Sequence, residues 1–277
     1  MMGLSSITSA MVRAQVRLRP STSCSPWDRW KCRTPLLYNG KMESVKVSPN
    51  DYVFVLTGAG ISVESGLPAF RSKDGTWNTE KLEDVCTPGA WERDPWKVWN
   101  FYSSRRREAA LAMPNPAHYA LAELEKKMGD RFFLCTQNVD DLHDRAGSQR
   151  MIHMHGELAK ARCSDGCSAP VTDKVLYDSL QDVNRCLWCG ALLRPHIVFF
   201  EETPLELNRI DSELDKVTLM IVIGTSGTVF PAAGFIHEAR MRLARTVYIG
   251  PEPPVNHKLY HELIIKPASE VVYEVSE

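Results

Sequence analysis

Side chains able to do acid–base chemistry follow a short apolar run near the middle of this 277-residue chain. Gln137, Asn138 and Asp140 come directly after the apolar residues 132–135, and His155 lies a little further on. An imidazole titrates near neutral pH, so His155 could act as a general base on a cofactor hydroxyl. Polar groups at the carboxyl end of a buried parallel strand are where an open α/β sheet binds its ligand. We therefore expect an enzyme site here.

Three further histidines need an interpretation. His153 lies two residues before His155, and in an extended segment both would point to one face, so only their context separates them. His143 and His196 are interpreted as structural.

Glycine-rich segments follow two other apolar runs, 51–56 and 219–223. Glycines after a strand allow a tight turn and close approach of the backbone to a pyrophosphate, although the third glycine of the first segment, Gly66, comes late. The second segment could contact a ribose or a phosphate. An ordinary turn is the other interpretation of each. The candidate cofactor residues are Gly58, Ala59, Gly60, Ser62, Gly224, Thr225 and Ser226.

Four of the eight cysteines form two close pairs, Cys163 with Cys167 and Cys186 with Cys189, with 18 residues between the pairs. Paired spacing in a long chain without a secretion signal argues for a metal rather than disulfides. Four thiolates at this spacing suit a closed tetrahedral zinc site with Zn–S near ~2.3 Å. Closed sites are structural because no position is left open for water.

A hydroxyl and a guanidinium lie three residues apart in a basic segment, at Tyr102 and Arg105. On a helix they would share a face. Together they could receive a carboxylate, because arginine forms a bidentate fork and tyrosine adds a third donor. A basic surface helix is the alternative interpretation.

Alternating strands and helices predict an α/β fold. Apolar runs at 51–56, 132–136, 197–200, 219–224 and 246–249 predict strands, and 116–128 and 232–243 have helical spacing. This order implies a Rossmann-like, mostly parallel sheet with a smaller zinc-binding and helical lobe. We expect the large part to comprise residues 46–74, 116–156 and 194–277, the helical insertion 75–115 and the zinc module 157–193.

Composition excludes several classes. Hydrophobic content is 44%, charged content is 24% and the net charge is −1, so nothing suggests a nucleic-acid or membrane partner. Residues 1–42 carry seven Lys/Arg and one acid. Such a segment fits a disordered basic arm, a start at Met42 or a transit peptide. We expect residues 1–45 to lie outside the catalytic domain, 46–277, of a cytoplasmic protein, or a mitochondrial one if the segment is a transit peptide.

In this order, TGAGIS, PAFR, TQNVDDLH, HMHGE, the two cysteine pairs, RPHIVFFEE and GTSGTVFPAAGF resemble the sirtuin family over about residues 50–275. The Tyr102/Arg105 pair and HMHGEL are most similar to its class III branch, the bacterial CobB-type deacylases. The resemblance implies NAD-dependent removal of acyl groups from lysine in acylated proteins, with NAD consumed, one structural Zn²⁺, and a monomer or weak oligomer. Tyr102 and Arg105 would bind the distal carboxylate of succinyl- or malonyl-lysine, favouring succinyl over acetyl by ~1.5–3 kcal/mol.

The resemblance also implies roles for single residues. In the family, the acyl oxygen attacks C1′ of the nicotinamide ribose, and the histidine matching His155 then deprotonates a ribose hydroxyl that attacks the resulting imidate. The products are free lysine, nicotinamide and O-acyl-ADP-ribose. The matching cofactor positions are Phe70, Arg71 and Trp77 in the loop 58–77, Gln137, Asn138 and Asp140 at the nicotinamide ribose, and Gly250, Pro251, Glu252 and Ala268 at the adenosine end.

Three departures from the family pattern matter. Glu201 replaces a glycine that permits an unusual φ or a close approach, in a loop that pairs with the substrate backbone. Gly250 replaces an asparagine near the adenosine ribose, which removes a side-chain contact with NAD. The first cysteine pair has three intervening residues where two are common.

Two other functions stay open. One is a mono-ADP-ribosyltransferase that uses the same activation of NAD, and Tyr102 with Arg105 argues against it. The other is an NAD-sensing or zinc-dependent interaction module with weak catalysis, for which Glu201 and Gly250 are the support.

Overall fold

The computed structural model of the protein describes residues 43–69 and 81–276. Contacts group Met42–Glu277 into one compact unit. The candidate residues Phe70, Arg71 and Trp77 lie outside the described residues.

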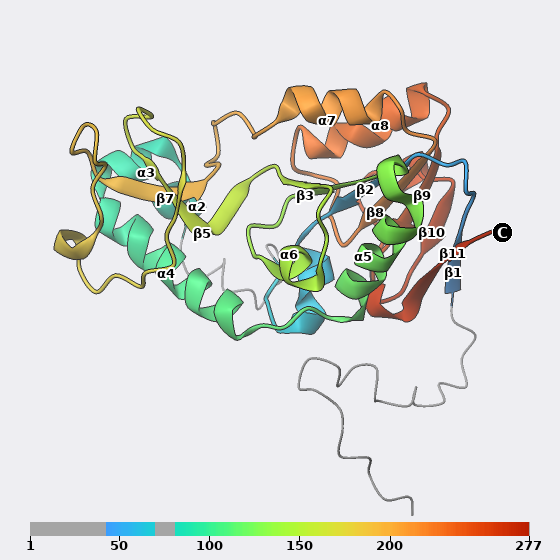
Figure 1. Ribbon diagram of the computed structural model, residues 1–277, viewed down its shortest axis with the longest axis horizontal. Coiled ribbons are helices and arrows are strands. Elements are labelled where there is room, and N and C mark those ends of the chain that lie inside the picture. The colour runs from blue at the N-terminus through green and yellow to red at the C-terminus, as the bar shows by residue number, and fades with distance from the viewer. Residues whose placement is uncertain (1–42, 70–80, 277) are drawn as a thin grey trace, which may run out of the picture. The chain divides into compact units, whose positions relative to one another are not determined.

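A six-stranded parallel sheet forms the centre of this unit (Figure 1). Its strands, in spatial order, are β10 (Glu262–Ile264), β9 (Arg245–Ile249), β8 (Leu219–Ile223), β2 (Val53–Thr57), β3 (Phe132–Thr136) and β4 (Met151–His153). Every residue of β2, β3 and β8 is buried. Such unbroken apolar runs are typical of parallel strands covered on both faces.

Helices and a small ribbon cover the two faces of this sheet. On one face lie α5 (Pro116–Met128) and the two-stranded parallel ribbon of β1 (Glu43–Val47) and β11 (Val271–Val275). On the other lie α7 (Leu207–Leu214) and α8 (Phe235–Met241) (Figure 1). The predicted helix 116–128 is confirmed: the side chain of Asn115 caps its first turn and Gly129, at φ 56°, ends it.

The smaller lobe combines helices with a second sheet. Its helices are α2 (Leu82–Val85), α3 (Pro88–Arg93) and α4 (Pro95–Leu111), and its antiparallel strands, in spatial order, are β6 (Val171–Thr172), β5 (Gly156–Cys163) and β7 (Leu193–Ile197). The Trp99 indole on α4 donates to the Leu193 carbonyl at 2.9 Å, which joins helix to sheet. The α/β fold with a smaller lobe is therefore confirmed.

Two boundaries predicted from the sequence are wrong. The apolar run 197–200 is not a strand of the parallel sheet: β7 ends at Ile197 and pairs with β5 in the small sheet, so residues 194–197 belong to the lobe. A short buried run has the same apolar character in either sheet, so composition alone cannot assign it. The boundary at residue 45 falls inside β1, which begins at Glu43 and pairs along its whole length with β11.

The strand order brings the candidate loops together. Within the sheet, β3 lies beside β2 on one side and β8 lies beside β2 on the other, so the strand order changes direction at β2. Such a reversal is where open parallel sheets bind ligands, beyond the carboxyl ends of the strands. The Gly58 amide donates to the Ile223 carbonyl at 2.9 Å, and the Gln137 amide donates to the Thr57 carbonyl at 2.9 Å. These bonds join the three loops edge to edge.

Candidate active site

A cleft of about 1010 Å³ opens above these loops, between the parallel sheet and the smaller lobe. The large part contributes the candidate residues Gly58, Ala59, Gly60, Gln137, His155, Gly224, Thr225, Ser226, Pro251 and Glu252. The lobe and the segment after it contribute Cys86, Tyr102, Ile197, Phe199, Phe200, Glu201 and Glu202. Most of the predicted site residues in the described part of the chain therefore meet in one cavity.

Glycines are required where the loop after β2 touches the loop after β8. A Cβ added to Gly60 would lie 2.6 Å from the Gly224 Cα, and one added to Gly224 would lie 2.5 Å from the Ile61 amide nitrogen. Gly224 also has φ 62°, a conformation that favours glycine. The two backbones can approach this closely only without side chains, which leaves peptide groups as the floor of the cleft.

His155 has the protonation expected of a base. Its Nδ1 lies 3.2 Å from the Gln137 carbonyl oxygen, which can only accept, so Nδ1 carries the proton and Nε2 keeps its lone pair. Burial lowers the pKa of His155. The ring is therefore neutral at neutral pH, and it borders the cleft.

A smaller pocket of about 90 Å³ shares Ala59 and Val139 with the cleft. Three candidate residues line it as a chain: Asn138 Nδ2 donates to Ser62 Oγ, and Ser62 Oγ donates to Asp140 Oδ2, each at 3.2 Å. Burial raises the pKa of Asp140, and hydrogen bonds from the Leu142 amide and the Ser62 hydroxyl act against the shift. Gln137 therefore lines the cleft, whereas Asn138 and Asp140 line the smaller pocket.

Tyr102 and Arg105 are buried on α4, so the interpretation as a basic surface helix is wrong. Tyr102 lines the cleft, and its hydroxyl donates to Cys86 Sγ at 3.3 Å. Arg105 lines the smaller pocket, where its Nη1 donates to Glu108 Oε2 at 2.9 Å. The tyrosine and the arginine thus border adjoining cavities.

The segment after β7 takes a conformation that glycine favours. Glu201 has φ 74°, which agrees with the expectation that this position requires an unusual φ. Glu202, next to it, receives bonds from Arg194 at 2.7 and 3.0 Å and from Arg162 at 2.7 Å. Although burial opposes it, the Arg194 bonds hold the pKa of Glu202 below its usual value. An ionised Glu202 therefore anchors this wall.

The adenosine end differs from expectation in two respects. Tyr248 occupies the space that a side chain at position 250 would need. A Cβ added to Gly250 would lie 2.4 Å from the Tyr248 hydroxyl oxygen. That hydroxyl donates to the Glu252 carbonyl at 2.9 Å, and Tyr248 lines the cleft. Ala268 is not among the cleft residues that the structure describes; it packs in the core beside α5.

Sequence reasoning missed Cys86, Tyr248 and Glu202 as cleft residues. Cys86 is a lone cysteine, and Tyr248 lies within an apolar strand, so neither carried a local signal. Glu202 could have been found from Arg194, because a buried arginine needs an acidic partner.

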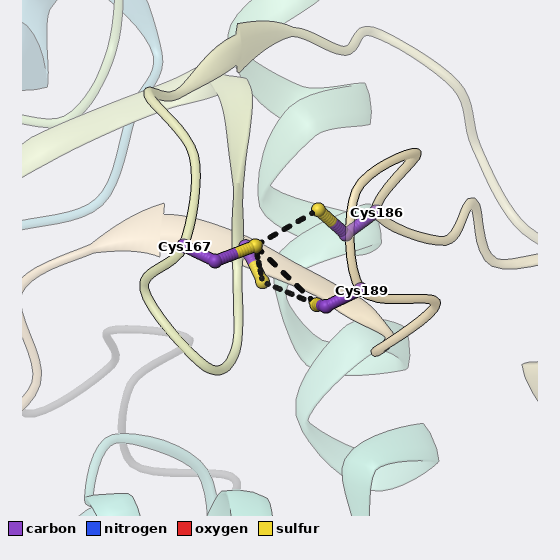
Figure 2. A group of neighbouring side chains, drawn as sticks. Cys167, Cys186 and Cys189 are labelled. Atoms are coloured by element: carbon purple, nitrogen blue, oxygen red, sulfur yellow. Dashed lines mark hydrogen bonds between the residues drawn. The ribbon is translucent and has the colours of Figure 1, made fainter.

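The four paired cysteines converge in the lobe (Figure 2). Their sulfur atoms all lie within 4.8 Å of one another. Cys167 Sγ is 3.3 Å from both Cys186 Sγ and Cys189 Sγ, and 3.5 Å from Cys163 Sγ. Four sulfurs this close suit tetrahedral zinc, whose ~2.3 Å Zn–S bonds leave sulfurs somewhat under 4 Å apart. The donor set therefore fits the expected zinc ion.

Among the described residues, no helix is both long enough and apolar enough to cross a membrane.

A comparison with protein-family models matches residues 58–231 to the Sir2 family, which is more than half of the chain. The chain belongs to the Sir2 family. The resemblance to sirtuins inferred from the motifs is thus confirmed.

Curated Sir2 relatives are similar over most of their length. An NAD-dependent protein deacylase of Escherichia coli (strain K12) is 48% identical over 227 residues, covering 81% of this chain and 81% of the relative. One of Caulobacter vibrioides is 48% identical over 229 residues, covering 79% and 93%. Solved Sir2 homologues have the same fold. One bound to ADP-ribose has a TM-score of 0.75 at 38% identity over 80% of this chain and 89% of the homologue, and an NAD complex has 0.73 at 38% over 80% and 87%.

Proposed function

We propose that this protein is an NAD-dependent protein-lysine deacylase that removes succinyl and malonyl groups, and also acetyl groups, from protein lysine. Nicotinamide, O-acyl-ADP-ribose and free lysine would be the products. The observation that carries the proposal is the position of His155, a histidine with a free basic nitrogen that borders a cleft floored by glycine loops and walled by Tyr102.

Use of NAD is supported by the floor of the cleft and by the relatives. The loops at Gly58–Gly60 and Gly224 present backbone to the cavity without side chains, as the approach of a pyrophosphate requires. Relatives of this chain are described as NAD-dependent, and one homologue was solved with NAD. NAD would supply the electrophilic ribose carbon.

His155 would act as the general base. The Gln137 carbonyl holds its Nδ1 proton and so directs Nε2 as the proton acceptor. Since burial also lowers the pKa of His155, the lone pair is available at neutral pH. The nicotinamide ribose would be held beside His155 by a hydrogen-bonded chain of side chains that runs from Asn138 through Ser62 to Asp140.

Tyr102 and Arg105 would recognise the far end of the acyl group. A hydroxyl and a guanidinium suit a carboxylate, and both are buried, where charge-assisted bonds are stronger. Glu108 already pairs with Arg105, so an incoming carboxylate would share the guanidinium with it. We therefore expect a preference for succinyl over acetyl that is finite rather than absolute.

Zinc would be bound by Cys163, Cys167, Cys186 and Cys189 and would have a structural role. All four protein ligands are present, which leaves no open position for a reacting water.

The test is nicotinamide release from NAD in the presence of matched succinyl-lysine and acetyl-lysine peptides. We expect release that depends on both NAD and peptide, with kcat/KM about 10- to 100-fold higher for succinyl, as a bond to a charged group implies. His155→Ala should abolish deacylation and retain NAD binding. Turnover retained in this variant would remove His155 as the base.

Arg105→Met tests the acyl pocket separately. It should depress desuccinylation far more than deacetylation, and Arg107→Met, which removes an exposed neighbouring charge, should change neither. Equal losses on both peptides would mean that Arg105 is structural. Acetyl-preferring activity in the unmodified enzyme would keep the deacylase and reject the carboxylate pocket.

A further inference from the structure

His153 and His155 hold neighbouring carbonyl groups of the same loop. His155 Nδ1 lies 3.2 Å from the Gln137 carbonyl oxygen, and His153 Nδ1 lies 3.1 Å from the Asn138 carbonyl oxygen. The second nitrogen distinguishes them. His153 Nε2 lies 3.0 Å from Asp144 Oδ2, whereas His155 borders the cleft.

These contacts require different protonation states. A carbonyl oxygen and a carboxylate oxygen are both acceptors, so each nitrogen of His153 must donate a proton. A neutral imidazole has only one N–H and would direct its lone pair at an oxygen. His153 is therefore an imidazolium in this arrangement, while His155 needs only one proton.

We infer that His153, charged and held by Asp144, is a positioning residue that fixes the Asn138 carbonyl and thereby the Asn138 amide in the small pocket. The His153 bond holds the backbone carbonyl of Asn138, and Thr136 Oγ1 accepts from its backbone nitrogen at 3.0 Å. With the backbone held at both groups, the position of the side-chain amide is fixed too. The Asn138 amide then donates to Ser62. This inference rests on the proposed use of NAD, because that pocket would hold the nicotinamide ribose.

The charges around His153 favour its cation. Burial lowers the pKa of His153, but the hydrogen bond and charge of Asp144 on α6 (Leu142–Ala146), the Asn138 carbonyl and the charge of Glu157 on β5 outweigh burial and raise it overall. Asp140, in the same loop, is also affected, since the His153 charge acts against the rise that burial gives its pKa.

Among the described residues, His143 on α6 is a further titratable group that interacts with His153. Burial, the charge of His118 and that of His153 together hold the pKa of His143 well below its usual range. A neutral His143 does not oppose the imidazolium. Of the three histidines His143, His153 and His155, His153 is thus the charged one.

The charge makes the position of Asn138 depend on pH. A group whose pKa is raised on folding contributes its stabilisation below its unfolded pKa and loses it as the pH rises through the folded value. The loop that contains Asn138 should therefore loosen at alkaline pH. His153 then loses a proton, and the lone pair of one ring nitrogen faces the lone pairs of an oxygen. Acidification through the same range should leave the bond intact.

The experiment measures nicotinamide release from mildly acidic to alkaline pH for the unmodified enzyme, His153→Gln and Asp144→Asn. Asp141→Asn is the matched control. It also removes a carboxylate at α6, but that carboxylate pairs with Arg145 and not with His153. In the unmodified enzyme, we expect nicotinamide release to decline at alkaline pH. His153→Gln should raise KM for NAD about tenfold, change kcat little and remove this decline. Asp144→Asn should move that decline about one pH unit lower. Asp141→Asn should match the unmodified enzyme.

A purely structural histidine would give another result. His153→Gln would then lower kcat in proportion to lost folded protein and leave the pH profile unmoved, which would overturn the inference. Nitrogen-15 NMR of the imidazoles tests the charge without activity: we expect both nitrogens of His153 protonated at neutral pH, and a neutral ring would overturn it. If the unmodified enzyme released no nicotinamide, the proposed function would fail, and the NMR result would still decide the charge.

Discussion

The two sides of the cleft are stabilised by different forces. The parallel sheet is buried between two apolar layers, with Val55, Leu134 and Ile221 fully inaccessible. The lobe has smaller apolar clusters and relies on polar cross-links. The buried Arg106 guanidinium donates to three backbone carbonyls and pairs with Asp173 at 3.4 Å, and four cysteines converge in the same lobe.

This difference has a consequence for the site. The glycine loops belong to the side held by apolar burial, which is spread over many residues. Tyr102 and Arg105 lie on α4, whose Trp99 and Arg106 make the bonds to the lobe's strands. The proposed acyl pocket therefore depends on a few specific interactions, whereas the glycine loops of the proposed NAD site rest on a broad apolar core.

The largest expected effect is loss of the proposed zinc ion. Cys186→Ser should remove one of its four ligands, and structural zinc supplies a binding free energy of about 10–16 kcal/mol in small domains. We expect deacylation to be lost and amide hydrogens of β5 and β7 to exchange rapidly, while those of β2, β3 and β8 stay protected. Hydrogen exchange read by mass spectrometry, with metal content, checks this.

Cys135→Ala is the control for that experiment. It removes a buried thiol from β3 in the large part and should leave both the metal content and the protection of β5 unchanged. Metal-free Cys186→Ser protein with full protection in β5 and β7 would show that the lobe does not need zinc.

The second effect concerns the buried ion pair. Arg106→Met should destabilise the protein by about 3–5 kcal/mol, because it leaves the Asp173 carboxylate buried without its cation. Arg107→Met, one residue along and exposed, should change stability by under about 0.5 kcal/mol. Urea unfolding of the two variants makes the comparison. Similar midpoints for both would mean that water or another group replaces Arg106.

The same contrast explains what the sequence could predict. β3 and α5 were assigned at their observed bounds, because a fully apolar run and a helix with Pro116 at its start have strong local signals. The cysteine cluster followed from spacing alone. The predicted strand 197–200 is wrong, because an apolar run does not show where it pairs: Ile197 ends a strand of the small antiparallel sheet, and residues 198–200 are in no strand.

Contacts between distant segments were beyond local patterns. Nothing in the sequence pairs Arg106 with Asp173, which lies 67 residues further along the chain. Likewise, the charge of His153 follows from Asp144 and the Asn138 carbonyl lying on opposite sides of its ring. The residue types could be named from the sequence, but their protonation states required the fold.

A third, smaller effect tests whether the two sides are independent. Ile221→Val removes one methylene from the apolar core beneath the glycine loops and should cost about 0.5–1.5 kcal/mol. Ile221 and Arg106 share no partner among the contacts described, so the double variant should show the sum of the two losses. A coupling above about 0.5 kcal/mol would show that the sheet and the lobe are energetically coupled at these two positions.

The smallest effect lies at the boundary between the two sides. Glu201 has φ 74° in the segment that walls the cleft, and a non-glycine residue there carries strain of about 1–3 kcal/mol. Glu201→Gly relieves that strain but gives the unfolded chain more freedom, so the net gain should be at most about 1 kcal/mol.

Glu206→Gly is the matched control, because Glu206 has φ 58° and does not line the cleft. Both variants should raise the midpoint of thermal unfolding slightly, but only Glu201→Gly should change KM for an acyl-lysine peptide. Equal KM values in both variants would mean that Glu201 does not contact the substrate, and a lowered midpoint in Glu201→Gly would mean that its side chain stabilises this wall by more than its backbone strains it.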